Sequence, residues 1–495
     1  MKRRLIAMAL ACLWTVLGAA AARAQDPLPD AVQAALSQLG LGADTLGAVA
    51  LPVGHGGRPW SHRAQVPMQP GSSMKVLTAA VALDRLEPDH RGSTELRSTA
   101  AIVDGALQGD LVLRGGADPE LGLPQLWALL MELRESGVRH IAGDLIVDRT
   151  RFRPARFDQG LPPFDEAPEF AYNGIPDALL LGENLLPLEI RATEAGVAAR
   201  SVPALPGVAL GSRMVLNDRP CSDWDEDWQP ARVTTEGQST LIELQGGFPR
   251  GCTRRTALAL LDRAVLTERL FAALWQGLGG TWAGRALEQA GPADSRVLAR
   301  RVSRPWGEVL RHTMKTSDNT LTRLLYLELG VPAMAGAPQA PTLALAGRAV
   351  RQWLAEKGIP DDGLVLDNGS GLSRSERISA WQLARVLQVA HAGRHASELM
   401  MSLPVAGVDG TMRRRLKDSP AAGWARLKTG TLNTTTALAG YVYDDEQRLW
   451  AVSMMVNTER AGRARVVLDA LVDSIARQGP HGRPALTIGP QGDGP

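Results

Sequence analysis

The sequence predicts a mixed α/β fold whose main sheet is built from the two ends of the chain. Residues 46–51 form an apolar run of strand length, and residues 439–443 and 449–456 form two more, separated by the turn-type segment 444–447. The run 76–83 and the segment 463–477 are longer and favour helices. We therefore expect helices packed against a sheet that includes residues 46–51 and the late hairpin.

The elements between these ends are predicted from length and periodicity. Residues 109–114 and 143–148 have the composition of strands, and residues 126–133 have apolar side chains at helical spacing. Residues 266–275 predict an amphipathic helix that stops at Gly277. In the final helix, 463–477, the apolar side chains share one face, which indicates packing on the sheet.

The N-terminus predicts export. Lys2-Arg3-Arg4 precedes the apolar run 5–22, and Ala22-Arg23-Ala24 offers the small residues that a signal peptidase reads, so residues 1–24 are interpreted as a signal peptide. Cys12 lies inside that run, in a poor context for lipoprotein processing. No other apolar run approaches the length that crosses a bilayer. We expect a periplasmic protein, soluble or peripherally associated, with a flexible tail at 479–495.

Two cysteines remain after signal removal, Cys221 and Cys252, and an oxidising compartment predicts that they form a disulfide. The loop between them contains the acidic, tryptophan-bearing run 223–228. Such a run is either a docking site or a solvated face, and we favour the solvated face.

Charge and motif content argue against several classes of partner. Removing residues 1–24 takes away four basic side chains and no acidic one, which leaves 50 Lys and Arg against 52 Asp and Glu. Neither a nucleic acid nor an anionic membrane is therefore expected as a partner. His391 and His395 lie four residues apart, but no acidic ligand pattern accompanies them. No metal, nucleotide or other cofactor is expected.

Ser72-Ser73-Met74-Lys75 precedes the helical run 76–83 and is the first motif with chemical meaning. Residues three apart share a helix face, so the Lys75 amine would lie beside the Ser72 hydroxyl and could take its proton. The pair is then a nucleophile with its base. Alone, the same pattern also fits a helix cap beside a solvated charge.

Two further motifs decide between these interpretations. Ser317-Asp318-Asn319 and Lys428-Thr429-Gly430-Thr431 follow in the order Ser-x-x-Lys, Ser-x-Asn, Lys-Thr-Gly. In acyl transfer from a peptide, Ser317 can relay a proton to the departing amine, Asn319 can hold the acyl-side amide, and Lys428 can face a free carboxylate. Gly430 would let an extended substrate lie along its strand, although Lys-Thr-Gly alone could be a turn.

This motif set resembles that of penicillin-binding proteins and serine β-lactamases. The blocks 69–75, 367–373 and 403–411 are similar to those of the class C, low-molecular-mass penicillin-binding proteins, the D-alanyl-D-alanine carboxypeptidase/endopeptidases of peptidase family S13. The resemblance implies an enzyme that hydrolyses peptidoglycan stem peptides ending in D-Ala-D-Ala and is blocked covalently by β-lactams. It implies Ser72 as acylated nucleophile and Lys75 as general base, with Ser317, Asn319, Lys428, Thr429, Gly430 and Thr431 binding substrate or relaying protons. The oxyanion hole would be the backbone N–H groups of Ser72 and Thr431.

Motif spacing predicts the domain organisation. Ser317 lies 245 positions after Ser72, whereas Lys428 lies only 111 positions after Ser317. β-Lactamases resemble the second interval but have a much shorter first one. We therefore expect a transpeptidase-type catalytic domain at 25–90 and 300–478, interrupted at 91–299 by one or two mainly β subdomains.

The chain departs from the family pattern in two places. The segment Leu321-Thr322-Arg323 stands where relatives often carry an acidic residue. The segment 170–174 lies where relatives place a tryptophan-containing segment with an aspartate that recognises the diaminopimelate amine; Asn173 cannot supply that charge, and nearby Asp177 could take over the role. Two alternatives to the peptidase stay open: a β-lactamase or esterase on the same scaffold, and a non-catalytic module that binds β-lactams or peptidoglycan.

Overall fold

The computed structural model describes residues 26–54, 56–160, 162–237, 239–459 and 461–482. Its main sheet is antiparallel with strand order β2-β1-β23-β22-β21. The strands are β1 (Leu46–Pro52), β2 (Trp60–His62), β21 (Arg426–Leu432), β22 (Thr435–Tyr443) and β23 (Leu449–Asn457). The strand predicted at 46–51 and the late hairpin are confirmed, and β21 occupies one edge of the sheet.

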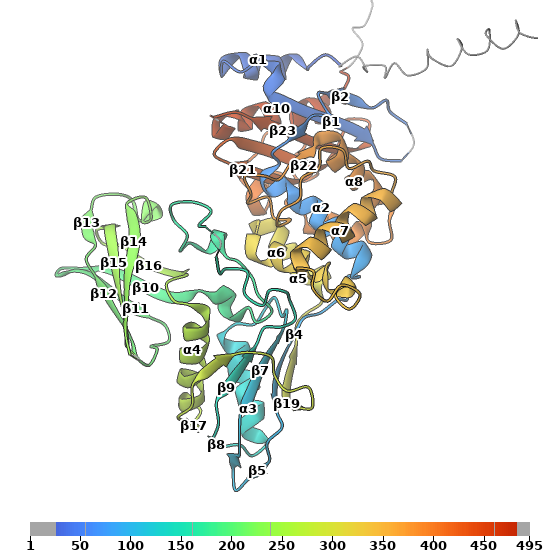
Figure 1. Cartoon of the computed structure of the whole chain (residues 1–495). Helices are drawn as coiled ribbons and strands as arrows, with labels where there is room; N and C mark the ends of the chain where they lie inside the picture. The colour runs from blue at the N-terminus through green and yellow to red at the C-terminus, as the bar shows by residue number, and fades with distance from the viewer. Residues whose placement is uncertain (1–25, 55, 161, 238, 460, 483–495) are drawn as a thin grey trace, which may run out of the picture.

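Helices cover both faces of this sheet (Figure 1). The termini supply one layer, α1 (Asp30–Gln38) and α10 (Arg465–Gln478), and α10 is the predicted closing helix. The other layer begins with α8 (Ala380–Ala392) against β1 and β23. Around it lie α2 (Lys75–Arg85), α5 (Trp306–Thr316), α6 (Asn319–Glu328), α7 (Thr342–Glu356) and α9 (Ala396–Ser402). A short pairing of β3 (Pro67–Met68) with β20 (Ile378–Ser379) joins the layer to the chain before α2.

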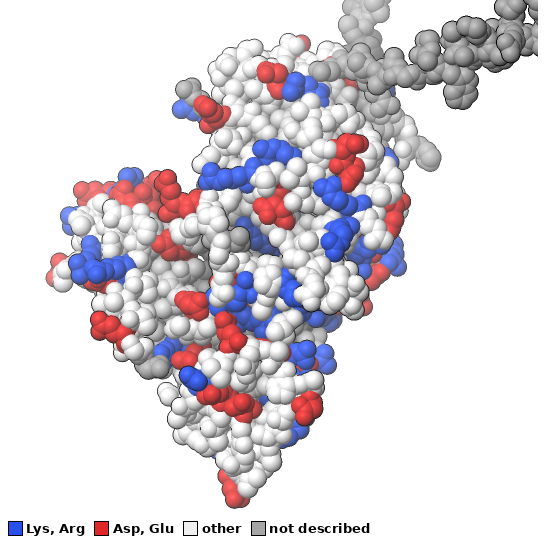
Figure 2. Space-filling model, viewed as in Figure 1, with Lys and Arg blue, Asp and Glu red and all other residues white. Residues whose placement is uncertain are grey.

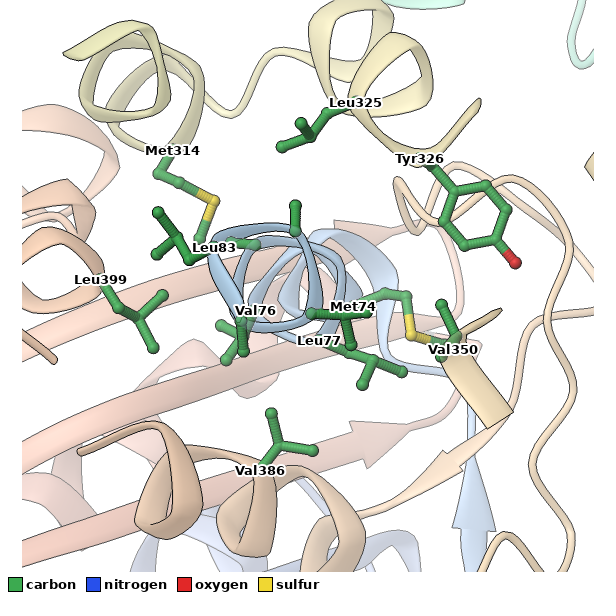
Figure 3. Close-up of a cluster of buried hydrophobic side chains, with 14 of the residues drawn as sticks. Met74, Val76, Leu77, Leu83, Met314, Leu325, Tyr326, Val350, Val386 and Leu399 are labelled. Atoms are coloured by element: carbon green, nitrogen blue, oxygen red, sulfur yellow. The ribbon is translucent and has the colours of Figure 1, made fainter. Parts of the chain in front are cut away.

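Helix α2 is the centre of the larger hydrophobic core. All nine of its residues from Lys75 to Leu83 are buried, which explains why this helix is apolar on every side. Figure 3 shows α2 end-on, with buried side chains from five other helices around it: Met314, Leu325, Tyr326, Val350, Val386 and Leu399. This packing fixes the start of α2 at Lys75 and the turn before it, which carries Ser72.

The chain between β4 and β19 builds a separate body. A five-stranded sheet of order β18-β9-β7-β4-β19 is packed against α3 (Leu123–Glu135) and α4 (Arg263–Gly277), which include the helices predicted at 126–133 and 266–275. Its strands are β4 (Ser93–Ser98), β7 (Leu111–Gly116), β9 (Leu145–Asp148), β18 (Ala286–Glu288) and β19 (Arg296–Val302). A smaller sheet joins β5 (Ile102–Val103), β6 (Ala106–Leu107), β8 (His140–Ile141) and β17 (Thr281–Trp282).

A second, all-β lobe lies beside α4 (Figure 1). One of its sheets contains β10 (Leu186–Thr193), β11 (Gly196–Ser201) and β16 (Thr253–Leu258). The other contains β12 (Val208–Ser212), β13 (Val215–Asn217), β14 (Trp228–Glu236) and β15 (Ser239–Pro249). Buried residues of both sheets, including Ile190 and Phe248, share one hydrophobic core with the neighbouring body.

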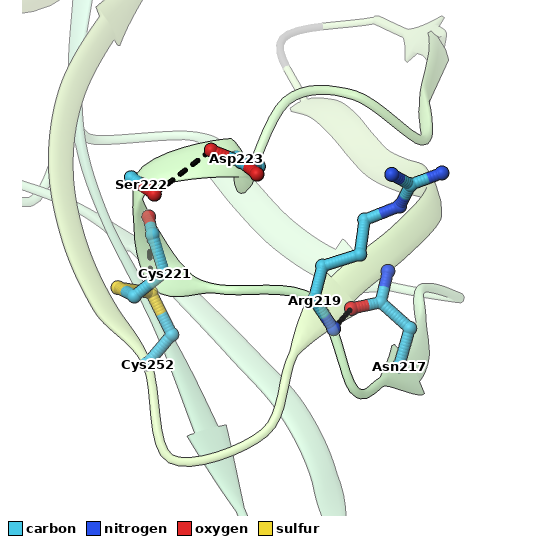
Figure 4. The surroundings of a disulfide bond; sticks show 6 residues. All are labelled: Asn217, Arg219, Cys221, Ser222, Asp223 and Cys252. Carbon is cyan, nitrogen blue, oxygen red and sulfur yellow. Dashed lines mark hydrogen bonds between the residues drawn. A yellow bond between two sulfur atoms is a disulfide. The ribbon is translucent and has the colours of Figure 1, made fainter.

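The predicted disulfide between Cys221 and Cys252 is present in this lobe, with 5.4 Å between the Cα atoms (Figure 4). In the acidic loop that follows, Asp227 accepts hydrogen bonds from Arg219 and Asn217. Trp224 and Trp228 turn inward instead and contact Phe170, with ring centroids 5.9 and 5.7 Å from that of Phe170, and the two indole centroids are 6.0 Å apart. The loop therefore has a solvated acidic face and an aromatic inner face.

A buried carboxylate joins the inserted region to the catalytic helices. Glu328 on α6 is 1% exposed and accepts two hydrogen bonds from Arg151, at 2.7 and 2.6 Å, while His90 lies 2.9 Å away. Both partners come from outside the helical layer, so this contact fixes how α6 meets the inserted chain.

Figure 2 shows acidic and basic side chains interspersed over the visible face, in agreement with the nearly balanced charge. Within the described ranges, none of the helices has the length and hydropathy that crossing a bilayer requires. The predicted signal peptide and residues 483–495 of the predicted tail lie outside the described residues.

Candidate active site

Ser72 lies in a 3-10 turn, Gly71–Met74, that runs directly into α2. The α-helix thus begins at Lys75 rather than at the serine, but the turn still places both side chains together. Lys75 Nζ is 3.1 Å from Ser72 Oγ, as the motif predicts. Neighbouring Ser73 turns away and donates to the carbonyl of Pro70.

The Lys75 amine has two further contacts, both with oxygen atoms. One is the side-chain Oδ1 of Asn319 at 2.6 Å, and the other is the carbonyl of Ser370. In the neutral form the amine has two N–H groups; when these donate to the two acceptors, the lone pair is directed at Ser72 Oγ. The geometry therefore suits a base waiting for the serine proton.

Electrostatics favour the same neutral form. The Lys75 side chain has no exposed surface, and burial is the main reason that its pKa lies well below the usual lysine value. The positive charges of Lys428 and Arg323 lower the pKa further, while Asp318 and Glu376 act in the opposite direction. A buried lysine of this kind holds a proton less tightly than an exposed one, so its neutral form can act as a base.

Ser317 occupies the sharp connection between α5 and α6. It adopts the left-handed conformation, with φ 64°, at the end of α5, and Asp318 caps the start of α6 by accepting from the Leu321 N–H. Lys428 Nζ donates to Ser317 Oγ at 2.8 Å and to the carbonyl of Thr429 at 2.9 Å. Burial lowers the pKa of Lys428 to about 7.

Gly430 brings the edge strand β21 against the serine turn. A Cβ at this position would lie 2.3 Å from the carbonyl oxygen of Pro70 and 3.1 Å from the amide nitrogen of Ser72. A Cβ at Gly71 would lie 3.0 Å from the amide nitrogen of Thr431. The backbone amides of Ser72 and Thr431, which are predicted to form the oxyanion hole, therefore both lie where β21 packs against the serine turn.

The remaining groups of the Lys-Thr-Gly motif face outward along β21. Thr431 is exposed, and Thr429 is partly exposed with its hydroxyl 2.8 Å from that of Thr411. Alternate backbone groups of an edge strand have no partner strand and are free to pair with an extended peptide. The predicted catalytic and substrate-binding residues therefore lie together, where the serine turn, the α5–α6 connection and β21 meet.

Sequence reasoning missed three backbone or positioning partners. Asn319 donates from Nδ2 to the carbonyl of Tyr172 at 2.8 Å, and the carbonyl of Ser370 binds Lys75. Arg323 donates to the carbonyls of residues 173 and 174 and of Leu372, and so joins two loops at the site. The sequence block 367–373 could have pointed to the loop that carries Ser370 and Leu372. The Tyr172 contact could not be found in this way, because every residue has a backbone carbonyl.

The suggestion that Asp177 could bind a substrate amine is wrong. Its carboxylate has no exposed surface and is 2.6 Å from Arg263 and 3.2 Å from Arg149, which neutralise it. Asn173 donates instead to Asp165 at 2.9 Å, and the Tyr172 hydroxyl also donates to that carboxylate. Burial and Asp165 raise the pKa of Tyr172 to about 12.

A serine paired with a buried lysine, a Ser-x-Asn turn and a Lys-Thr-Gly edge strand define an acyl-transferring serine enzyme of the penicillin-binding class. The chain belongs to the D-Ala-D-Ala carboxypeptidase 3 (S13) family, whose model matches residues 28–478.

Three comparisons accompany this assignment. A D-alanyl-D-alanine carboxypeptidase of Actinomadura is 32% identical over 493 residues, which cover 95% of this chain and 89% of the relative. The carboxypeptidase DacB of Haemophilus influenzae is 27% identical, covering 80% and 81%. The crystal structure of penicillin-binding protein 4 (dacB) from Haemophilus influenzae superposes with TM-score 0.73 at 25% identity and covers 86% of this chain and 94% of that one. The predicted fold class is thereby confirmed.

Proposed function

We propose that this serine-type D-alanyl-D-alanine carboxypeptidase cleaves the terminal bond of peptidoglycan stem peptides through an acyl-enzyme on Ser72. The single observation that carries the proposal is the contact of Ser72 Oγ with a buried Lys75 amine whose N–H groups both have acceptors. That arrangement activates a hydroxyl as a nucleophile, and a helix cap does not require it.

In the acylation step, the Ser72 hydroxyl gives its proton to Lys75 Nζ while Oγ bonds to the carbonyl carbon of the penultimate D-Ala. The carbonyl oxygen becomes an oxyanion, which the N–H groups of Ser72 and Thr431 stabilise. When the C–N bond breaks, the Ser317 hydroxyl delivers a proton to the departing amine, and free D-Ala leaves. Ser317 Oγ in turn takes up the proton that Lys75 received from Ser72, so the net transfer is one proton from Ser72 to the amine of D-Ala.

Binding of the C-terminal carboxylate is assigned to Lys428. Its amine is buried between Ser317 and the backbone of β21, so a carboxylate there would meet an ammonium group with little competing water. The hydroxyls of Thr429 and Thr431 lie on the same strand and can donate to that carboxylate. Asn319 has its oxygen committed to Lys75 and its nitrogen to Tyr172, so its first task is to orient the base.

Hydrolysis completes the cycle when a water attacks the Ser72 ester and Oγ takes back a proton. A β-lactam acylates the same oxygen by opening of its ring amide, which makes β-lactams covalent inhibitors wherever this water reaction is slow. A cross-link whose amine comes from a second stem peptide presents the same kind of bond, so endopeptidase action is part of the proposal.

We further propose that the enzyme works in the periplasm after removal of residues 1–24. The catalytic domain comprises 25–90 and 300–478, and 91–299 forms the accessory part. Support for this division comes from the pairing of β1 with β23 in one sheet and from the separate core of the inserted strands.

The test is intact mass after incubation with benzylpenicillin, together with D-Ala release from diacetyl-Lys-D-Ala-D-Ala. Wild type should gain one adduct and release D-Ala, and Ser72→Ala should do neither. Ser73→Ala is the matched control, because this serine shares the turn but bonds to Pro70. An adduct that persists in Ser72→Ala contradicts the proposal, and rapid penicillin turnover would favour a β-lactamase instead.

A further inference from the structure

Glu376 is a buried carboxyl group beside the active site that takes no part in the steps above. Its side chain has no exposed surface. Oε1 accepts from the backbone N–H groups of Gly369 at 2.8 Å, Asn368 at 3.1 Å and Asp367 at 3.3 Å, and Oε2 accepts from that of Gly371 at 2.9 Å. Because all four partners are donors, the ionised carboxylate fits this position.

The four N–H groups belong to a loop, residues 367–371, that contacts α2 on its other side. The carbonyl of Gly369 accepts from the Thr78 hydroxyl at 2.7 Å, and the carbonyl of Ser370 accepts from Lys75 Nζ. Lys75 and Thr78 are three residues apart and share one face of α2. Glu376 therefore binds the N–H groups of a loop whose carbonyl groups contact α2 and the general base Lys75.

The same loop also supports the nucleophile. Gly371 has φ +82°, and a Cβ there would lie 1.9 Å from the carbonyl oxygen of Gly71 and 2.7 Å from the amide nitrogen of Ser72. The backbone of Gly371 is thus packed directly on the serine turn. A displacement of the loop would move both Ser72 and the acceptor of Lys75.

We propose that Glu376 is a positioning residue for the Ser72–Lys75 pair, because its carboxylate fixes the loop that supplies an acceptor to Lys75 and a packing surface to the serine turn. The inference rests on the acyl transfer proposed above. It assigns to one buried side chain the task of keeping the lysine lone pair directed at the serine.

The negative charge of Glu376 should affect the pH profile of acylation, which a purely structural role of this side chain would leave unchanged. The charged groups that act on Lys75 are Lys428, Arg323, Asp318 and Glu376. Burial raises the pKa of Glu376 itself and Asp367 adds to this, while the backbone N–H groups of the loop lower it. Tyr326 also lies within the influence of Glu376. Glu376 raises the pKa of Lys75. Removing its negative charge should move the acidic limb of the acylation profile to lower pH.

Glu376→Gln and Glu376→Asp separate position from charge. A glutamine has one acceptor oxygen and one donor nitrogen, so it cannot serve N–H groups on both sides, and an aspartate keeps the charge but is one methylene shorter. We expect both to lower the second-order rate of acylation by benzylpenicillin about ten-fold or more. The acidic limb should shift to lower pH in Glu376→Gln and stay in place in Glu376→Asp.

The matched control is Glu328→Gln, which removes an equally buried carboxylate that binds Arg151 rather than the loop. It should lower the melting temperature and leave the pH profile of acylation unchanged. Wild-type acylation rates in folded Glu376→Asp, or a Glu376→Gln profile whose limb does not move, would overturn the proposal. Adduct formation that does not need Ser72 is the distinct result that contradicts the proposed function itself.

Discussion

The side-chain oxygen of Asn319 lies 2.6 Å from the amine of Lys75, although 244 residues separate the two in the chain. The amide cannot be reversed, because its nitrogen donates to the carbonyl of Tyr172. One uncharged side chain thus connects the general base, the start of α6 and the inserted segment that carries Tyr172.

Asn319→Asp should reduce acylation by benzylpenicillin strongly at pH 7. A carboxylate in contact with Lys75 favours the ammonium form and raises the pKa of Lys75, so less of the free base is present at a given pH. The loss should shrink as the pH rises. Asn433→Asp, on the exposed β21–β22 turn, is the control, and an unchanged rate in Asn319→Asp would contradict the assigned contact.

The pH profile of D-Ala release should be bell-shaped. Activity needs neutral Lys75, so it rises with pH through the lowered pKa of that group; it also needs charged Lys428, so it falls above the pKa of about 7. Arginine stays protonated over this range. Lys428→Arg should therefore move the alkaline limb to higher pH, and an alkaline limb that is the same in both enzymes would rule out Lys428 as its source.

Gly430→Ala should impair both stability and acylation. The new methyl group would lie 2.3 Å from the carbonyl of Pro70, so β21 and the serine turn must separate, at a cost of about 1–3 kcal/mol in unfolding free energy. We expect acylation at least ten-fold slower. In Gly462→Ala the added methyl meets no neighbouring atom within 4 Å, and this variant should behave as wild type in the thermal melt and the acylation assay.

Replacing Cys221 and Cys252 together by alanine should destabilise the β lobe and leave the chemistry intact. Loop-closure entropy for a separation of 31 residues suggests a loss of about 3–4 kcal/mol. Limited proteolysis should show faster cleavage within the lobe. Benzylpenicillin acylation should stay within about two-fold of wild type, and a larger fall would show that the aromatic contacts of Phe170 transmit the loss to the site.

The contact of Glu328 with Arg151 predicts an acid-sensitive interface. Burial acts to raise the pKa of Glu328, but Arg151 and His90 outweigh it, so the pKa is lowered. A carboxyl group with a depressed pKa stabilises the fold above its unfolded pKa and loses that effect as the pH falls. The melting-temperature gap between wild type and Glu328→Gln should be widest near neutral pH and narrow with acidification; a gap independent of pH would contradict this.

The sequence could predict the site wherever side-chain identity carries the chemistry. Ser72, Lys75, Ser317, Asn319 and Lys428 stand in motifs whose order is specific, and their contacts follow from it. The strands at 46–51 and in the late hairpin were predictable for the same kind of reason, because their apolar runs have the length of buried strands.

What could not be predicted depends on backbone geometry and long-range pairing. The acceptor of Lys75 at Ser370 is a carbonyl, which every residue possesses, and the role of Glu376 depends on a loop conformation. Asp177 looked available because its ion pairs with Arg149 and Arg263 come from positions remote in the chain. The sequence indicates that Gly430 makes room for substrate, and the structure adds that a side chain there would meet the carbonyl of Pro70.

The pairing of β1 with β23 has a consequence for how the enzyme matures. Ala48 and Met454 are register partners although about 400 residues separate them, so the catalytic sheet cannot close until nearly the whole polypeptide has emerged. The inserted body can condense earlier around its own local contacts. A chain truncated before residue 449 would possess Ser72 and Lys75 but lack β23, so the sheet behind the catalytic helices would be incomplete.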